Sequence, residues 1–119
     1  RERAYAPYSR FPVGAALLCS GGPVYEGCNV ENAAYGLSVC AERVAAFRAV
    51  SEGRRDFEAL AVVTGSREPA MPCGSCRQVL AEFNPRLRVL LANLEGRVVC
   101  TTLEELLPRP FVLREGDPE

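Results

Sequence analysis

Apolar and polar positions in the first third of the chain follow the short period of extended strands. Residues 11–19 form a nearly continuous apolar run, residues 24–29 form a second extended run, and the turn-forming residues 20–23 (Ser-Gly-Gly-Pro) separate them. Short apolar runs joined by a turn of this composition are typical of neighbouring antiparallel strands. The pattern therefore predicts a β-hairpin.

The period lengthens to that of a helix in two later segments. Apolar residues recur every three or four positions between Cys40 and Gly53, and again between Pro72 and Asn84. This spacing places them on one side of a helix, and Gly53 and Pro85 are typical of helix ends. The sequence therefore predicts two helices.

Short apolar runs at 60–63, 88–92 and 97–100 predict three further strands. Thr102, with Glu105 three residues later, forms a capping-box pattern that predicts a short final helix. The element order is thus ββαβαββα, a hairpin followed by β–α crossovers. This order predicts an α/β fold in which a mixed five-stranded sheet carries helices on both faces, in three α/β/α layers.

Length and composition agree with one compact domain spanning 1–119. The chain has 119 residues, of which 48% are hydrophobic, and domains of this size are common. No apolar stretch approaches the roughly 18 residues of a membrane span. Residues 1–5 lack the apolar core of a signal peptide. We therefore expect a cytoplasmic protein without a membrane partner.

Charge and residue types exclude several classes of function. The net charge is −1, from 14 basic and 15 acidic side chains, and the single adjacent basic pair is Arg54-Arg55, so we expect no nucleic-acid partner. The chain has no histidine, which excludes catalysis by Ser-His-Asp or Cys-His groups and zinc sites of the HExxH type. It also has no lysine, which excludes Schiff-base chemistry. Acid–base work is left to Glu, Asp, Tyr or Cys.

Two cysteine clusters at predicted helix starts carry the candidate chemistry: Cys40-Ala41-Glu42, and Cys73 with Cys76 directly after Pro72. A helix N-terminus stabilises a thiolate, which is the form that binds metal. Residues three apart project from one side of a helix. Three thiolates would leave one position of a tetrahedral Zn²⁺ open for water, as in catalytic sites.

Two charged neighbours fit such a site. Glu42 lies two residues after the first ligand, where its carboxylate can move protons to and from metal-bound water. Arg43 can donate hydrogen bonds to a ligand sulfur and offset the charge of three thiolates.

Other interpretations of the cysteines remain open. Cys73 and Cys76 could form a redox pair, or Cys28 or Cys100 could close a structural four-cysteine zinc site. Cys19, Cys28 and Cys100 lie in apolar strands and are expected to be inert core residues.

The motifs Cys-Ala-Glu and Pro-Cys-x-x-Cys match the signature of zinc deaminases in an all-cysteine form. The chain resembles the cytidine deaminases, specifically their small homotetrameric type, over nearly its whole length. The resemblance rests on segments in the family's order, at 11–17, 27–33, 40–43, 72–79 and 106–108.

The resemblance implies zinc-dependent hydrolytic deamination of cytidine and deoxycytidine to uridine and deoxyuridine, with release of ammonia, in pyrimidine salvage. It implies one Zn²⁺ per subunit, held by Cys40, Cys73 and Cys76. Zinc-activated water would attack C4 of the ring, while Glu42 would protonate N3 and then pass a proton to the leaving amine. Active sites would lie at the boundaries between subunits of a homotetramer.

The resemblance also implies substrate contacts. Asn29 and Glu31 would bind the ribose hydroxyl. Side chains that lie two residues apart in a strand point to the same side of the sheet, which fits this shared role. The backbone of Ala41 would meet the pyrimidine edge. Three aromatic side chains would complete the pocket, Phe11 against the base and Tyr35 and Phe111 at the shared subunit boundary.

Some features differ from the family or leave alternatives. Relatives normally have a further helix before residues 7–9, and Ala34 and Gly36 stand where they often carry Cys and Pro. The related blasticidin deaminases share the zinc motif and act on a larger cytosine nucleoside. A zinc-stabilised domain without catalysis is a further alternative.

Overall fold

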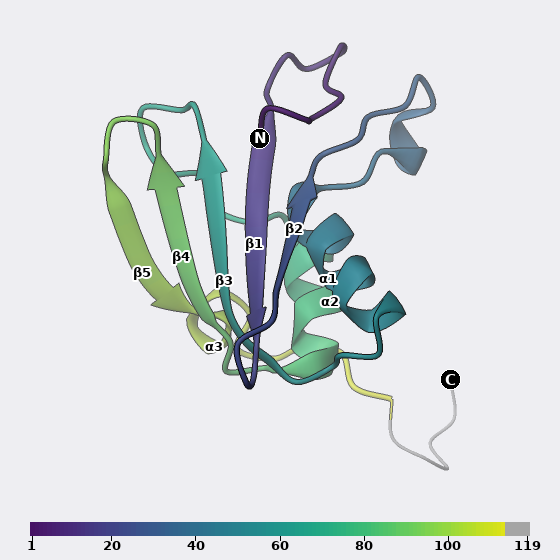
Figure 1. Cartoon of the computed structure of the whole chain (residues 1–119), viewed down its shortest axis with the longest axis vertical. Helices are drawn as coiled ribbons and strands as arrows, with labels where there is room; N and C mark the ends of the chain where they lie inside the picture. The colour runs from purple at the N-terminus through teal and green to yellow at the C-terminus, as the bar shows by residue number, and fades with distance from the viewer. Residues whose placement is uncertain (114–119) are drawn as a thin grey trace.

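The computed structural model describes residues 1–113, and a single five-stranded sheet lies at its centre (Figure 1). The strand order is β2-β1-β3-β4-β5, with β3 and β4 parallel and the other neighbouring pairs antiparallel. The predicted mixed sheet and its opening hairpin are therefore confirmed. The strands are β1 (Val13–Cys19), β2 (Val24–Cys28), β3 (Phe57–Thr64), β4 (Arg88–Asn93) and β5 (Val98–Thr102).

The predicted helices are all present, and the first two start slightly later than predicted. They are α1 (Ala41–Ser51), α2 (Gly74–Phe83) and α3 (Leu103–Leu106), and a short 3-10 turn, η1 (Tyr35–Leu37), precedes α1. Cys40 and Cys73 have extended backbones and cap α1 and α2 at their N-termini. For α3 the predicted cap is confirmed, since the Thr102 hydroxyl accepts a hydrogen bond from the Glu105 amide.

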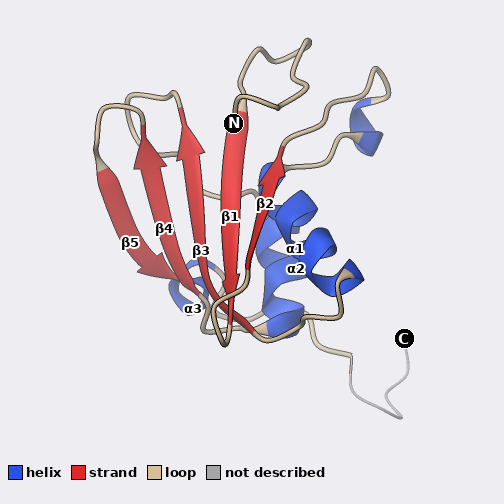
Figure 2. Ribbon diagram, viewed as in Figure 1, coloured by secondary structure: helices blue, strands red, loops and turns tan. Residues whose placement is uncertain are grey.

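The helices lie against one face of the sheet (Figure 2). Alternate residues of β1, β3 and β4 point to that face and pack with the alanines of α1 and with Leu80 of α2. The main buried contributors from the strands are Ala15, Leu17, Cys19, Leu60, Val62, Val89 and Leu91.

The prediction of helices on both faces holds for one face only within residues 1–113. On the other face, Ala61 and Leu90 are exposed. The N-terminal residues reach this face as turns, and Arg1 lies so close to Gly14 that an added Cβ there would stand 2.5 Å from the Arg1 nitrogen. Pro7 and Pro12 interrupt any regular helix in this segment, because proline cannot donate the backbone hydrogen bond. The three-layer arrangement is therefore absent from the described residues.

A close contact between β2 and α1 fixes the position of the first cysteine. A Cβ added at Gly27 would lie against the Ala41 carbonyl oxygen and 2.5 Å from the Ala45 nitrogen. Ala41, Ala45 and Ala49 are fully buried, so small side chains on both elements let the helix backbone approach the strand. This approach places the start of α1 beside the end of β2.

The strand β3 begins at Phe57, earlier than the predicted start at residue 60. Phe57 and Ala59 are buried while Glu58 is exposed, which is the alternation of a strand with one face covered. Its pairing with β1 shifts register between Leu18 and Cys19.

Within residues 1–113 no helix is long and apolar enough to cross a membrane.

Candidate metal centre

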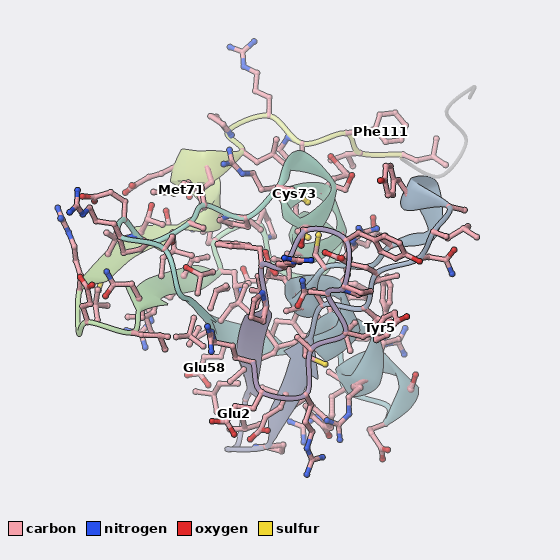
Figure 3. All side chains as sticks on the ribbon, turned by 90° about the horizontal axis from the view of Figure 1, so that it is seen from above. Glu2, Tyr5, Glu58, Met71, Cys73 and Phe111 are labelled. Carbon is pink, nitrogen blue, oxygen red and sulfur yellow. The ribbon has the colours of Figure 1, made fainter. Side chains whose placement is uncertain are left out.

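Three thiols meet where the N-termini of α1 and α2 converge. The sulfur of Cys73 lies 3.6 Å from that of Cys40 and 3.3 Å from that of Cys76, and all three sulfurs fall within 4.8 Å of one another. Figure 3 shows Cys73 at the start of α2. The structure therefore brings together the three cysteines singled out from the sequence, which come from two segments 33 residues apart.

The two helix starts explain why the sulfurs converge. Cys40 and Cys73 are the caps of their helices, with φ and ψ in the extended region. Neither cap uses its side chain to satisfy the helix amides, so both thiols remain available to a ligand. The positive end of each helix dipole then favours negative charge at the sulfurs.

Neighbouring groups shift the pKa values of two of the three thiols in opposite directions. A hydrogen bond from Cys76, assisted by Arg43, lowers the pKa of the Cys40 thiol to about 5. The hydrogen bond to Cys40, together with burial and the nearby Glu42 charge, raises the pKa of Cys76. A cation at the centre of the triangle would compete with protons for the sulfurs, because metals bind the deprotonated thiolates.

Arg43 is the positive group beside the thiols. Its Nη2 lies 3.7 Å from the Cys40 sulfur and 3.5 Å from the Ser38 carbonyl oxygen. Its Nε is buried and has no hydrogen-bond partner within residues 1–113. A buried donor without a partner is costly, and an additional negative charge at the sulfurs would stabilise it. Three thiolates around Zn²⁺ carry such a charge, so the residues present fit the ion.

Glu42 is the buried carboxyl of this centre. It is only 5% exposed, although glutamate in a first helical turn is usually solvated. Burial raises the pKa of Glu42, and the neighbouring Cys40 thiolate raises it further. A carboxyl in this state can hold a proton at higher pH than an exposed glutamate can.

The remaining cysteines stay apart from the centre. All six cysteines are free, and within residues 1–113 the group with metal-ligand spacing consists of Cys40, Cys73 and Cys76 alone. Cys19 is fully buried in the core, as expected, whereas Cys100 is exposed on β5. The Cys28 thiol points to the Arg3 carbonyl oxygen. A closed site that uses Cys28 or Cys100 as fourth ligand is therefore not formed here.

Asn29 and Glu31 both bind the loop that precedes β1. The buried Asn29 amide accepts a hydrogen bond from the Val13 nitrogen and donates one to the Phe11 carbonyl oxygen, each at 2.9 Å. The Glu31 carboxylate accepts hydrogen bonds from the Tyr8 amide at 3.0 Å, the Ser9 amide at 3.1 Å and the Ser9 hydroxyl. These bonds, chiefly those from Ser9, lower the pKa of Glu31. The two side chains thus fix the loop 7–13 against the end of β2.

A cavity of about 360 Å³ opens beside this carboxylate. Its lining is Tyr8, Ser9, Glu31, Tyr35 and Ser38, and the rings of Tyr8 and Tyr35 meet edge to face at 6.2 Å. The carbonyl of Ser38 is the group that Arg43 contacts, so the cavity and the metal centre share a wall.

Sequence reasoning missed Tyr8, Ser9 and Ser38. The signal available was the dense turn-like polarity of residues 7–10 and the short spacing from Ser38 to Cys40. Neither signal identifies the residues that these side chains contact, because the contacts with Glu31 and Arg43 depend on tertiary structure.

The other expected substrate contacts lie at different depths. Ala41 is fully buried at the first position of α1, whereas Phe11 is 39% exposed. Tyr35 and Phe111 are 76% and 71% exposed. Both lie at the surface of this single chain.

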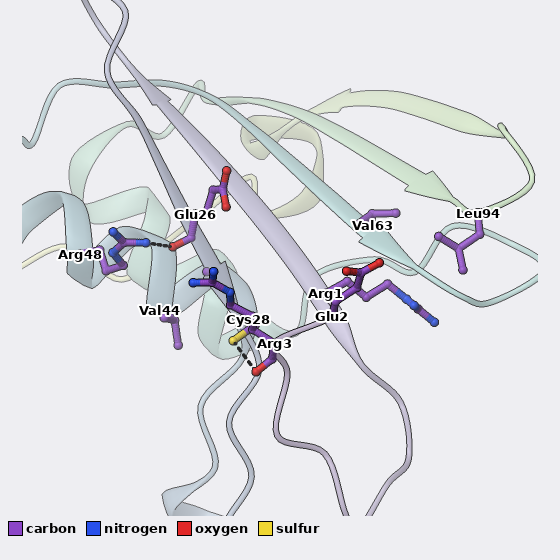
Figure 4. A pocket seen from close by; sticks show the side chains of 10 residues that line it. Arg1, Glu2, Arg3, Glu26, Cys28, Val44, Arg48, Val63 and Leu94 are labelled. Atoms are coloured by element: carbon purple, nitrogen blue, oxygen red, sulfur yellow. Dashed lines mark hydrogen bonds between the residues drawn. The ribbon is translucent and has the colours of Figure 1, made fainter.

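A larger cavity, of about 570 Å³, lies away from the thiols (Figure 4). The N-terminal residues, the end of β2 and the outer side of α1 line it. Its main polar contact joins Arg48 to the Glu26 carbonyl oxygen at 2.9 Å. None of its lining residues belongs to the metal centre, so its size does not make it the reactive site.

Comparison with known proteins agrees with this geometry. Residues 1–92 match the sequence model of the "Cytidine and deoxycytidylate deaminase zinc-binding region". The chain belongs to this zinc-binding deaminase family.

Individual relatives in the deaminase family extend the match over most of the chain. A cytidine deaminase of Sporosarcina psychrophila is 57% identical, over 93% of this chain and 82% of that protein. The crystal structure of a cytidine deaminase from Burkholderia pseudomallei superposes with a TM-score of 0.90 at 54% identity, covering 93% of this chain and 90% of that one. A blasticidin-S deaminase of Bacillus cereus is 34% identical, over 83% of this chain and 76% of that protein.

Proposed function

We propose that this protein is a zinc-dependent cytidine deaminase that hydrolyses cytidine and deoxycytidine to uridine and deoxyuridine and releases ammonia. The observation that carries the proposal is the triangle of three thiols with one buried carboxyl beside it. Such a site lacks a fourth protein ligand among the described residues and keeps a proton carrier at hand. Relatives that share more than half of the sequence are named cytidine deaminases, which supports the substrate.

Each group of the centre has a distinct task in this proposal. Cys40, Cys73 and Cys76 would hold Zn²⁺, which when bound supplies Lewis acidity and a water of lowered pKa. Arg43 balances the negative charge of the thiolates through its contact with the Cys40 sulfur.

Glu42 carries the protons. Its raised pKa lets the carboxyl take a proton from the attacking water and give it to N3 of the pyrimidine. It then takes the remaining proton from the hydroxyl added at C4 and delivers it to the exocyclic nitrogen, so that the C4–N bond breaks, ammonia leaves and the C4 carbonyl forms. A carboxyl whose pKa is raised above its ordinary value accepts a proton more readily than an exposed glutamate, which suits a group that must take up a proton and pass it on.

The nucleoside would occupy the space between the metal centre and the cavity beside Glu31. Asn29 and Glu31 would bind the ribose hydroxyl, and the Ala41 backbone would meet the pyrimidine edge. Phe11 would lie against the base, and Tyr35 at the rim of the cavity would cover the sugar side.

We further infer that residues 1–119 form one domain that works as a cytoplasmic homotetramer in pyrimidine salvage, without a nucleic-acid partner. The exposed rings of Tyr35 and Phe111 support an assembly in which a neighbouring subunit covers them and Phe111 enters the neighbour's pocket. Sedimentation would contradict this if the purified protein remained a monomer at assay concentrations.

A Glu42→Gln variant tests the proposed reaction. The amide keeps the shape of the side chain but cannot carry a proton, so the variant should retain zinc and lose turnover of cytidine by about 10²- to 10⁴-fold. Loss of absorbance at the cytosine band measures turnover, and metal analysis measures zinc. Glu82→Gln, an exposed change on α2, is the matched control. Substantial activity in the Glu42 variant would remove the proton role from this residue.

A blasticidin-type deaminase is the second candidate, and the 34% identity to the Bacillus cereus enzyme favours it. An assay of cytidine and blasticidin S side by side separates the two. A protein that holds zinc but turns over neither substrate would instead be a zinc-stabilised domain without catalysis.

A further inference from the structure

The C-terminal segment is attached to α2 by the side chain of Gln78. Its Oε1 accepts a hydrogen bond from the Phe111 amide at 3.1 Å, and its Nε2 donates one to the Phe111 carbonyl oxygen at 2.9 Å. One amide side chain thus satisfies both backbone groups of one residue, as a neighbouring β-strand would. The contact holds the backbone of Phe111 and leaves its ring free.

Arg77, the preceding residue, holds the other end of the same segment. Its Nε donates to the Pro72 carbonyl oxygen at 2.8 Å and its Nη1 donates to the Leu106 carbonyl oxygen at 2.9 Å. Arg77 and Gln78 directly follow the metal ligand Cys76. The first turns of α2 therefore hold three segments by hydrogen bonds: the loop before Cys73, the end of α3 and the C-terminal segment.

The ring of Phe111 is not used for packing within its own chain. It is 71% exposed, and the next two residues, Val112 and Leu113, are 62% and 53% exposed. Figure 3 shows the Phe111 ring at the outer edge of the molecule, pointing away from it. Exposing an aromatic ring forgoes the free energy of its burial. The two hydrogen bonds from Gln78 therefore fix a residue whose ring adds little packing to the fold of this chain. They do fix the direction in which the ring is presented.

We propose that Gln78 is a positioning residue, which holds the backbone of Phe111 so that the ring is presented in a fixed place to the nucleoside site of a neighbouring copy. The proposal rests on the proposed function, and it adds a residue that touches neither metal nor nucleoside. Because the grip is on the backbone, Gln78 should affect substrate binding only through Phe111.

A fluorescent reporter tests the attachment without any assay of activity. The chain has no tryptophan and four tyrosines, so Phe111→Trp introduces a single tryptophan that can be excited selectively at the red edge of its absorption. Its anisotropy should be high with Gln78 present and should fall clearly when Gln78→Ala is added. Zinc content and thermal midpoint should stay the same. Glu82→Ala, four residues further along α2, is the matched control and should leave the anisotropy unchanged. An anisotropy that does not respond to Gln78→Ala would overturn the proposal.

Steady-state kinetics with cytidine test the consequence. Gln78→Ala should raise KM by about tenfold, the effect of two lost hydrogen bonds, with a smaller effect on kcat. In a Phe111→Ala background the same change should have no further effect, because residues that act through one another are not additive. An equal rise in KM in both backgrounds would overturn the proposal. If the unmodified protein deaminated no cytidine, the proposed function would fail, while the anisotropy would still decide whether Gln78 holds the segment.

Discussion

The candidate metal centre and the rim of the proposed nucleoside pocket are built in opposite ways. At the centre, Cys76 is fully buried and Glu42 is 5% exposed, and both belong to helices that pack on the sheet. At the proposed rim, Tyr35 in the short turn η1 is 76% exposed, and Phe111, which a neighbouring copy would contribute, is 71% exposed. The centre is therefore held by the core, whereas the rim is held by a few polar contacts made by side chains such as Glu31 and Gln78.

This difference indicates how the two regions should respond to mutation. A change at Cys76 or Glu42 disturbs a buried group that water cannot easily replace, so its effect on metal and stability should be large. A change at the rim removes hydrogen bonds that water can partly replace, so its effect should appear in substrate binding and leave the fold intact.

Removal of one thiolate should have the largest effect. In Cys76→Ser the hydroxyl does not ionise at neutral pH and cannot replace the buried thiolate as ligand. Zinc affinity should fall by more than about 100-fold, since changes that only touch a ligand already cost 10- to 100-fold. Metal analysis after dialysis against a weak chelator measures the loss, and turnover should disappear with the metal.

The control for this experiment is Cys100→Ser, because Cys100 is exposed on β5 and lies outside the thiol triangle. It should keep both zinc and activity. If Cys100→Ser lost zinc to the same degree, the ligand set described above would be incomplete.

A methyl group between β2 and α1 should have the next largest effect. In Gly27→Ala the new Cβ would stand 2.5 Å from the Ala45 nitrogen and against the Ala41 carbonyl oxygen, both of which are backbone atoms that cannot rotate away. The start of α1 must then shift and carry Cys40 with it. Unfolding free energy should fall by about 1–3 kcal/mol, the usual cost of overpacking, and zinc should bind more weakly.

Gly36→Ala is the matched control for that change, because nothing lies within 4 Å of a Cβ added at Gly36. Denaturant unfolding of the two variants compares their stabilities. Equal midpoints would show that α1 can move away from β2 without cost, and the centre would then be less rigid than the burial of Ala41 and Ala45 implies.

The sequence predicted the centre better than the rim, for a physical reason. Cysteines at helix starts, two of them three residues apart, are recognisable from local patterns as candidate metal ligands, although the fold must bring the two segments together. The strands and helices around them were predicted from period, apart from the early start of β3 at Phe57. The candidate ligands of the centre therefore follow from short-range patterns.

The rim depends on contacts between distant segments. Glu31 receives three hydrogen bonds from residues 22 and 23 positions away, and Gln78 contacts a residue 33 positions away. No local pattern specifies such partners. The uncovered face of the sheet was also not predictable from strand composition, since Ala61 and Leu90 are apolar although exposed.

Loss of the Ser9 hydroxyl should have the smallest effect, and pH should reveal it. The Ser9 hydroxyl is the main group that lowers the pKa of Glu31. A carboxylate with a lowered pKa keeps its favourable contacts above its unfolded pKa and loses them as pH falls through the lower, folded value. In Ser9→Ala the pKa of Glu31 should rise towards its ordinary value, so those contacts should be lost at a higher pH.

At neutral pH the KM of the Ser9→Ala variant for cytidine should rise only a few-fold, because the two amide hydrogen bonds to Glu31 remain. Between about pH 3 and 6, where carboxylates titrate, the acid limb of the kcat/KM profile should shift to higher pH than in the unmodified protein. Ser51→Ala, an exposed change at the end of α1, should leave that limb in place. If Ser9→Ala and Ser51→Ala gave the same profile, the Glu31 carboxylate would not be part of the nucleoside site, and the rim would have to be assigned to other residues.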